Sequence, residues 1–330
     1  MSRPSDADSV KLISVAPMMA WTDRHCRYLH RLYSPNALLF TEMVTTGALT
    51  HGGQWHQLDY SEAEHPVALQ LGGNQPKDLA ACTRAAAQRG YDEVKLNVGC
   101  PSDRVQQGTF GACLMLQPQL VANCIKAMQD ASDIPVSVKC RLGVDDHDTN
   151  ATLLEFISTV ADTGCSRFYL HARKAILGGL TPAQNRSIPP LQPWRVQWLK
   201  EQRPELEIVI NGGITELDQA LEHLTWADGV MIGRAAYHQP MLLAQLERAI
   251  FEPQHQVNTA AILNNYLIYM QRELQAGTRL SAMTRHLLHC CSGMPGARRF
   301  RRLLSDSQRL RDNDLQVVHE AIAQILPEAA

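Results

Sequence analysis

Short runs of apolar residues alternate with longer amphipathic segments from residue 13 to about residue 235. Runs rich in Val, Ile and Leu, each followed by a crossover, are typical of parallel strands buried on both faces. The sequence predicts eight such strands: Ile13–Met18, Ala37–Met43, Pro66–Leu71, Glu93–Val98, Pro135–Lys139, Arg167–His171, Glu207–Asn211 and Gly229–Ile232.

The segments between these runs have the residue spacing of helices. They include Asp78–Arg89, Gln119–Asp130, Thr152–Thr163, Pro193–Gln202 and Leu217–His223. Gly90 and Gly164 follow two of them, as expected where a helix ends in a left-handed residue. Eight parallel strands with crossover helices predict an α/β fold, a (β/α)8 TIM barrel. An open, doubly wound sheet is the alternative, but no G-x-G-x-x-G motif follows the first strand.

From about residue 241 onward the pattern is helical, with no further strand. Helices are expected over Met241–Phe251, Thr259–Gly277, Leu280–Cys291 and from Leu304 to the C-terminus. A (β/α)8 barrel uses about 250 residues, so the 330-residue chain has room for one small additional domain. We therefore expect a barrel domain over residues 1–240 and a small C-terminal helical domain over residues 241–330.

Composition narrows the class of protein. Apolar residues make up 45% of the chain and charged residues 19%, which excludes extensive disorder. The formal net charge of −2 excludes a general polycation that coats nucleic acid. No apolar run approaches a membrane span, and the N-terminal residues do not resemble a signal peptide. Nine cysteines at irregular spacings are typical of free thiols in a reducing cytoplasm, so we expect a cytoplasmic protein without membrane association.

Positive charge is concentrated in the predicted helical domain. It contains ten Arg and no Lys, and residues 272–311 carry nine Arg against Glu273 and Asp306, a local balance of +7. The densest stretch is Arg298-Arg299-Phe300-Arg301-Arg302. A solvated helix face is the simplest explanation of such a run, but the scarcity of acidic neighbours favours a phosphate-rich partner. His286, His289, Cys290 and Cys291 are interpreted as part of an ordinary helix, so no metal is expected.

Polar residues follow nearly every predicted strand, at the barrel end where TIM-barrel enzymes place their active sites. Gly212 and Gly213 follow the seventh strand and Gly233-Arg234 the eighth, the usual place for a phosphate. Asn211 ends the seventh strand. This pattern predicts an enzyme with a phosphate-bearing ligand, although the glycines could serve only as turns.

Three further strand-end side chains have both a structural and a functional interpretation. Lys139 could simply reach solvent, or it could be a fixed cation that stabilises an anion formed in the reaction. His171 could be a core histidine, but its position before Ala172-Arg173 favours a ligand contact. Gln70 could cap a turn, or it could hydrogen-bond a planar heteroaromatic ligand.

Cys100 differs from the other cysteines because it lies between Gly99 and Pro101 in an irregular segment after the fourth strand. We expect it to face the cavity. A thiol with a reference pKa of about 8.5 is mostly protonated at neutral pH and can act as a general acid. The stretch from residue 172 to 192 is longer than ordinary barrel loops, which favours a binding loop or lid.

Together these motifs resemble the tRNA-dihydrouridine synthases, over nearly the whole chain. The matching elements are Ala16-Pro17-Met18, Thr41-Glu42-Met43, Gln70-Leu71-Gly72-Gly73, Leu96-Asn97-Val98-Gly99-Cys100-Pro101, Val138-Lys139, His171-Ala172-Arg173, Asn211-Gly212-Gly213-Ile214 and Ile232-Gly233-Arg234. The segments Trp21–Arg27, Asn185-Arg186 and Ile188-Pro189-Pro190 are similar to the A-type branch, which acts on uridines 20 and 20a of the tRNA D-loop. Ala20, Leu116 and Ala183 depart from the family pattern, where an acidic residue, Gly and Lys are expected.

The resemblance implies an FMN cofactor that is reduced by NADPH. It implies that the flavin contacts Pro17, Met18, Met19, Gln70, Lys139 and His171, and that its phosphate binds Asn211, Gly212, Gly213, Gly233 and Arg234. It further implies hydride transfer from flavin N5 to uracil C6 and proton donation from Cys100 to C5. The target base would have to leave its stack to reach the flavin. We expect tRNA contacts from Asn97, Arg186, Arg299 and Arg302, and we expect no stable protein partner.

Two alternatives remain open at this point. An FMN-dependent barrel oxidoreductase that acts on a free pyrimidine or an enone would explain the barrel motifs but not the arginines. An RNA-binding protein or RNA chaperone with a vestigial barrel would explain the arginines but would bind no flavin.

Overall fold

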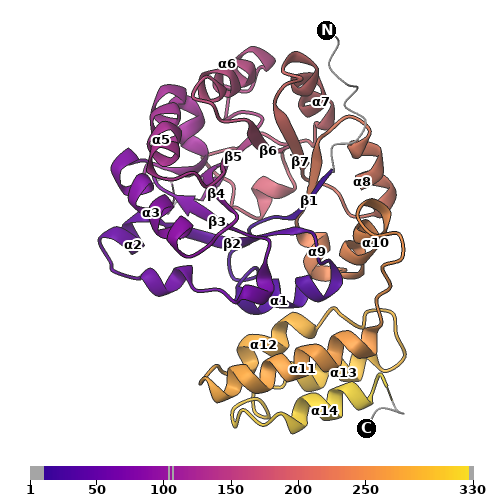
Figure 1. The fold of residues 1–330 in the computed structure, drawn as a ribbon. Helices are drawn as coiled ribbons and strands as arrows, with labels where there is room; N and C mark the ends of the chain where they lie inside the picture. The colour runs from indigo at the N-terminus through magenta and orange to yellow at the C-terminus, as the bar shows by residue number, and fades with distance from the viewer. Residues whose placement is uncertain (1–10, 103–104, 106–107, 327–330) are drawn as a thin grey trace. The chain divides into compact units, whose positions relative to one another are not determined.

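The computed structural model describes residues 11–102, 105 and 108–326. In this part of the chain eight parallel strands form a closed barrel in sequence order (Figure 1). They are β1 (Leu12–Val15), β2 (Leu38–Thr45), β3 (Val67–Gly72), β4 (Glu93–Val98), β5 (Val136–Arg141), β6 (Arg167–His171), β7 (Glu207–Asn211) and β8 (Gly229–Ile232). Pairing of β1 with β8, from Leu12↔Gly229 to Val15↔Ile232, closes the barrel. The predicted TIM barrel is confirmed and the open sheet is wrong.

The strand bounds differ from prediction mainly in β1, β2 and β5, and β5 ends at Arg141 rather than at Lys139. β1 ends at Val15 rather than at Met18, because the ladder finishes where the Ala16 amide donates to the Ile232 carbonyl at 2.8 Å and Pro17 has no N–H. β2 runs past its predicted end at Met43 to Thr45, with an irregular register between Phe40 and Met43. Such an irregularity bends a strand and is common at barrel rims.

The barrel helices begin and end where the local chemistry predicts. They are α2 (Thr46–Thr50), α3 (Pro76–Gln88), α5 (Pro118–Ala131), α6 (Asn150–Ala161), α7 (Pro193–Gln202) and α8 (Leu217–Leu224), with 3-10 turns η1 (Trp55–Leu58), η3 (Gly111–Leu116) and η4 (Gln184–Arg186). Proline opens α3, α5 and α7, where its missing N–H costs no helical hydrogen bond. Gly90 and Gly164 follow α3 and α6 with φ of +83° and +95°, as predicted for helix ends.

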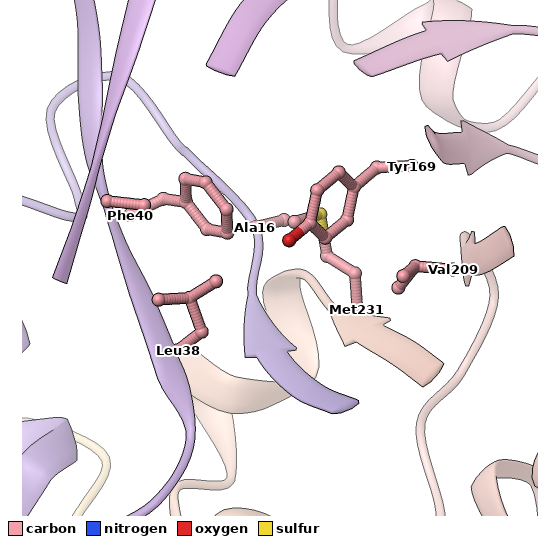
Figure 2. Close-up of a cluster of buried hydrophobic side chains, with 7 residues drawn as sticks. Ala16, Leu38, Phe40, Tyr169, Val209 and Met231 are labelled. Carbon is pink, nitrogen blue, oxygen red and sulfur yellow. The ribbon is translucent and has the colours of Figure 1, made fainter. Parts of the chain in front are cut away.

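The barrel interior is packed with side chains rather than hollow. Its apolar core consists of Ala16, Leu38, Phe40, Ala68, Tyr169, Val209 and Met231 (Figure 2). The Phe40 and Tyr169 rings meet edge to face, with centroids 5.4 Å apart. A filled interior leaves the carboxyl ends of the strands as the place for a ligand.

The contacts divide the chain into two compact units. The first contains the residues up to Pro17, Leu38–Tyr60 and His65–Gly233, and the second contains Met18–Ala37, Ser61–Glu64 and the chain from Arg234 onward. The predicted boundary at 240/241 lies seven residues beyond the Gly233–Arg234 junction, and it misses the early segment. A buried carboxylate is one of the contacts within the second unit. Glu247 accepts hydrogen bonds from Ser34 Oγ (2.5 Å) and the Asn36 amide (3.1 Å), which ties residues 34–36 to the second unit.

The second unit is helical in its described residues. Its helices are α1 (Arg24–Tyr33), α9 (Arg234–His238), α10 (Met241–Ile250), α11 (Thr259–Gln275), α12 (Leu280–Leu287), α13 (Ala297–Leu304) and α14 (Gln316–Ala323), with the 3-10 turn η2 (Glu62–Glu64). No helix in the described chain is long and apolar enough to cross a membrane.

The last predicted helix, from Leu304 to the C-terminus, is wrong. Leu304 ends α13, and α14 begins only at Gln316. Asp306 and Asp314 accept hydrogen bonds from the amides of Gln308 and Gln316, and Asn313 is left-handed with φ of +55°. Such side-chain bonds compete with the helical ladder, which explains the interruption. Residues 327–330 lie outside the described part of the chain.

Candidate active site at the barrel mouth

Polar side chains converge where the strands end. The register pairs Asn97 with Lys139, and it pairs His171 with both Arg141 and Asn211. Residues paired across neighbouring parallel strands point to the same side, so these side chains line one end of the barrel. The structure therefore brings together five residues of β4 to β7 that the sequence could only place at separate strand ends.

The mouth is strongly electropositive. Burial, and then the charge of Arg141, lower the pKa of Lys139 to about 8. Burial and the nearby cations Arg141, Lys139, Arg173 and Arg186 hold the pKa of His171 well below its usual value. Burial also lowers the pKa of Arg141 to about 10, with Arg186 and Arg173 contributing. Cations that repel one another at a fixed site are stabilised by a bound anion, so this geometry favours an anionic ligand.

The turns after β7 and β8 are open glycine turns. Gly212 has φ of +112°, and a Cβ there would lie 2.6 Å from His171 Cδ2. Gly213 has φ of +74°, and a Cβ there would collide with Leu191, whereas Gly233 faces open space. The amides of these three glycines donate to no acceptor among the described residues. Donors that remain available in this way fit a phosphate.

Asn211 and Arg234 flank these turns differently. Asn211 is buried, and its Nδ2 donates to the Met231 carbonyl at 2.8 Å, which joins β7 to β8 beneath the glycines. Arg234 is exposed at the start of α9 and belongs to the second unit. Asn211 therefore shapes the turn. Only the hydrogen-bonding groups of its side chain that do not bond Met231 are available to a ligand.

Gln70 is an unsatisfied buried amide on β3. Its side chain is 2% exposed, and its Oε1 has no hydrogen-bond partner among the described residues. A buried acceptor without a partner is costly, so such a group commonly marks a ligand or water position. This fits a heteroaromatic ligand with an N–H group.

The loop that carries Cys100 is held by side chains of the strand ends. Asn97 Oδ1 accepts from the amides of Gly99 (3.1 Å) and Cys100 (3.0 Å), and Arg141 Nε donates to the Gly99 carbonyl at 2.9 Å. Asn97, which was expected to contact tRNA, thus has a positioning role through this oxygen. The Cys100 thiol is half-buried, with its Sγ 3.5 Å from Ser102 Oγ.

All nine cysteines are free thiols. Besides Cys100, only Cys113 and Cys290 are not fully buried. Burial raises the pKa of Cys113, and it raises the pKa of Cys290 to about 12. These two thiols are poor candidates for chemistry, whereas Cys100 lies close enough to the mouth to affect the pKa of both Lys139 and Arg141.

The long loop after β6 is anchored by Asn185. Its buried amide accepts from the Ile176 amide at 2.8 Å and donates to the Ile176 carbonyl at 2.9 Å. Arg141 Nη1 donates to the Asn185 carbonyl at 2.9 Å. Arg186 comes next and is exposed, while Ala183 precedes the turn η4. Sequence reasoning missed the roles of Arg141 and Asn185, because only their burial and partners distinguish them from other polar loop residues.

Residues 17–20 span the junction between the units. Pro17 ends the first unit, and Met18 and Met19 belong to the second. The Met18 amide donates to Thr22 Oγ1 at 2.9 Å, and the Met19 side chain is 63% exposed. Ala20, at a departure from the family pattern, is left-handed with φ of +62°.

The arginines of α13 cover its solvent face. Ala297, Phe300 and Leu304 form the buried face, and Arg298, Arg299, Arg301 and Arg302 are all exposed. Elsewhere in the unit Arg309 pairs with Glu320 at 2.9 Å, and Arg285 lies 3.9 Å from Asp23. The four arginines of α13 form no ion pair with any described residue, so their charge is available to a partner.

The cluster of His and Cys residues near α12 is structural. His286 is buried with its Nε2 3.0 Å from Asp23 Oδ1, and the Cys290 thiol donates to the His286 carbonyl. No group of three or more potential metal ligands occurs in the described part of the chain.

A closed parallel barrel with polar strand ends has the architecture of a TIM-barrel enzyme, and its cationic mouth and glycine turns suit an anionic ligand. The chain belongs to the dihydrouridine synthase (Dus) family, whose model matches residues 14–326. It is therefore an oxidoreductase, and the interpretation as an RNA-binding protein with a vestigial barrel is wrong.

Three relatives show how far the similarity extends, and each is named tRNA-dihydrouridine(20/20a) synthase. The one from Vibrio cholerae serotype O1 is 53% identical over 315 residues, 95% of this chain and 96% of the relative. The one from Shewanella oneidensis is 52% identical over 316 residues, 96% and 94% of the two chains. The one from Escherichia coli K12 is 53% identical over 311 residues, 94% and 90%.

Solved structures support the fold at much lower identity. The chain resembles 2-naphthoyl-CoA reductase in complex with 2-naphthoyl-CoA at 11% identity and a TM-score of 0.56, covering 72% of this chain and 50% of that one. It resembles morphinone reductase at 12% identity and a TM-score of 0.53, covering 74% and 91%. At this identity the likeness concerns the barrel alone.

Proposed function

We propose that this enzyme reduces uridine to 5,6-dihydrouridine at positions 20 and 20a of the tRNA D-loop. FMN would be its bound cofactor and NADPH the reductant. The names of relatives that are 53% identical over 95% of the chain support the substrate. The structural observation that carries the proposal is a half-buried free thiol, Cys100, held by Asn97 beside a cationic barrel mouth.

The residues at the mouth fit FMN. The unpartnered Gln70 Oε1 can accept from the N–H of a flavin ring, and Lys139 can face its negative edge. Gly212, Gly213 and Gly233 offer free amides to the phosphate, and Asn211 shapes that turn. Because the negative phosphate offsets the repulsion among the mouth cations, its binding would stabilise Arg141 and favour protonation of His171. Pro17, Met18, Met19 and Arg234 complete the proposed flavin set.

Individual residues of the chain then have separate roles in the reaction. When bound and reduced by NADPH, FMN would supply a hydride to C6 of the uracil. Cys100 donates a proton to C5, which compensates the negative charge that the hydride brings and is worth about 10²–10⁴ in rate. Asn97 and Arg141 fix the loop so that the thiol stays in place. Lys139 stabilises negative charge in the mouth.

The tRNA contacts in this proposal lie in both units. Arg186 of the loop after β6, with Asn97 at the strand end, would contact the D-loop, and Arg299 and Arg302 of α13 would contact phosphates. The Arg299 and Arg302 guanidinium groups are exposed and form no ion pair with described residues, which suits them to phosphate oxygens. The target uridine would be extruded from its stack to enter the mouth.

The test uses purified protein, NADPH and an unmodified tRNA transcript. We expect a flavin absorbance spectrum and dihydrouridine at positions 20 and 20a by mass spectrometry of nuclease fragments. Free uridine serves as the second substrate. Comparable turnover of free uridine would instead support an FMN barrel that acts on free pyrimidines or enones.

We also propose that the protein works in the cytoplasm. Nine free cysteines are consistent with a reducing compartment, and a tRNA substrate belongs there. Thiol-trapping of the protein in intact cells should label the exposed fraction of these cysteines without prior reduction.

A further inference from the structure

Lys95 is a buried lysine in the middle of the barrel. It lies on β4, where its register partners are Gln70 of β3 and Ser137 of β5. Its side chain is 0% exposed, and its Nζ has no hydrogen-bond partner among the described residues. The Nζ lies 3.3 Å from the centroid of Phe40 and 4.7 Å from that of Tyr169. Figure 2 shows these two rings in the apolar interior of the barrel.

The fold does not need this amine as a partner for the nearby acid. Glu93 Oε1 accepts from Ser137 Oγ at 2.5 Å, and its Oε2 pairs with Arg167 at 2.5 Å and accepts from the Tyr169 hydroxyl at 3.3 Å. The carboxylate is thus satisfied and neutralised without Lys95. A buried amine without a hydrogen bond is costly, and a side chain such as Met would fill the same space without that cost. The position therefore points to a role beyond packing.

Lys95 lies directly below the ring of residues that line the mouth. Asn97 follows two residues later on the same face of β4 and pairs with Lys139, while Lys95 itself pairs with Gln70. Lys95 and Lys139 are therefore diagonal neighbours on adjacent strands, and residues in this arrangement are about 7–8 Å apart. Burial and the charge of Lys139 lower the pKa of Lys95 well below its usual value, and Glu93 opposes this shift. A negative charge in the mouth would raise that pKa again, so the protonation of Lys95 is linked to the charge of the ligand.

We propose that Lys95 is a positioning residue that makes the bound flavin easier to reduce, by providing a positive charge beneath it when the flavin becomes negative. This inference rests on the proposed function. Hydride transfer from NADPH gives the flavin two electrons and one proton, releases NADP⁺ and leaves one negative charge on the cofactor. The Lys95 amine then takes one proton from solvent and becomes an ammonium. The rings of Phe40 and Tyr169 stabilise this cation, since an aromatic face attracts a desolvated positive charge.

The test compares the FMN-loaded wild type with Lys95→Met, which keeps the length of the side chain and removes the titratable group. The midpoint potential of the bound flavin is measured against a reference dye between pH 6 and pH 9. We expect the variant to be harder to reduce, with at least a tenfold lower ratio of reduced to oxidised flavin at a fixed poise, about 30 mV for a two-electron couple. We also expect fewer protons to be taken from weakly buffered solution when NADPH reduces the flavin. Flavin content and thermal stability should stay the same or rise.

Lys126→Met is the matched control, because it removes an exposed lysine of α5 that pairs with Asp130 in the same unit. It should leave both the potential and the proton uptake unchanged. Lys95→Gln provides a second variant if the methionine variant does not fold. A variant that retains flavin with wild-type potential and proton uptake overturns the inference, and lost stability with an unchanged potential assigns Lys95 to the fold. A wild type that binds no flavin would contradict the proposed function itself, which is a different result.

Discussion

The chain carries two groups of cationic side chains in contrasting environments. Lys139 and Arg141 at the barrel mouth are half-buried and buried, and burial together with repulsion from neighbouring cations lowers their pKa values. Arg298, Arg299, Arg301 and Arg302 of α13 are exposed and form no ion pair with described residues. Arg141 is fixed in the mouth by the backbone carbonyls of Gly99 and Asn185.

This difference indicates that the two groups have different functions, although both carry positive charge. A fixed, desolvated cation acts strongly on charge that develops within a few ångströms, but it costs folding free energy. An exposed arginine costs little and acts on a polyanion through counterion release, an effect that salt weakens. The barrel mouth is thus suited to chemistry and α13 to RNA attraction.

The largest expected effect concerns the thiol beside the mouth. Cys100→Ala should slow reoxidation of reduced flavin by tRNA by about 10²–10⁴, because the proton donor to C5 is lost. Flavin content, reduction by NADPH and tRNA affinity should remain normal. Stopped-flow absorbance measures the two half-reactions separately, and Cys113→Ala is the matched control because that thiol is also half-buried. Reoxidation at the wild-type rate would remove Cys100 from the mechanism.

Lys139→Ala should reduce the rate of flavin reduction by NADPH at least tenfold, while tRNA affinity stays within experimental error. The pKa of Lys139 is lowered to about 8, so its charge is lost as the pH rises through 8. The wild-type reduction rate should therefore fall above that pH, and this step should be missing in the variant. A normal reduction rate with weak tRNA binding would reverse the assignment.

The cost of the mouth cations can be measured as folding stability. Lys139→Met in flavin-free protein at pH 7 should raise the free energy of unfolding by about 1–2 kcal/mol, since a half-buried cation is replaced by an apolar chain. The sign follows from linkage: the pKa is about 8 when folded and 10.5 as the ordinary value. The wild type should thus become more stable as the pH rises from 8 to 10.5, which removes the advantage of the variant. Urea unfolding measures this, and Arg302→Ala should change stability by no more than about 0.5 kcal/mol.

The smallest expected effects are single arginine losses on α13. Arg299→Ala or Arg302→Ala should each reduce the slope of log affinity for tRNA against log salt by about 1 or slightly less. At moderate salt this weakens binding only about threefold. Arg309→Ala is the matched control, because Arg309 already pairs with Glu320 in the same unit. Equal slopes for all three variants and the wild type would show that α13 does not bind RNA.

Local pattern was enough to predict the barrel, but not the long-range contacts. The bounds of β4, β6, β7 and β8 follow directly from apolar runs, and Gly90 and Gly164 mark helix ends. Residues 18–37 belong to the second unit, where Ser34 bonds Glu247 more than two hundred residues away, a contact that no local pattern shows.

Lys95 and Arg141 show the same limit at the site. Alternation in β4 places Lys95 on the inward face, yet a lysine in a strand is usually solvated, and only the closed barrel shows that its amine is buried. Arg141 lies just beyond the predicted fifth strand, but its role in holding two loops depends on the carbonyls of Gly99 and Asn185. Both residues acquire their function from tertiary contacts.

The most direct test of the division between the two cationic groups is a crossed comparison of Lys139→Ala with the double variant Arg299→Ala/Arg302→Ala. Each protein is assayed for the rate of flavin reduction by NADPH and for tRNA affinity between 50 and 200 mM salt, the range over which phosphate contacts are resolved. We expect Lys139→Ala to lose reduction rate with an unchanged salt slope. The double variant should keep the reduction rate and lose about 2 from the slope. A double variant with the full wild-type slope, or a Lys139 variant that reduces its flavin normally but binds tRNA weakly, would show that the two cationic groups do not divide the work in this way.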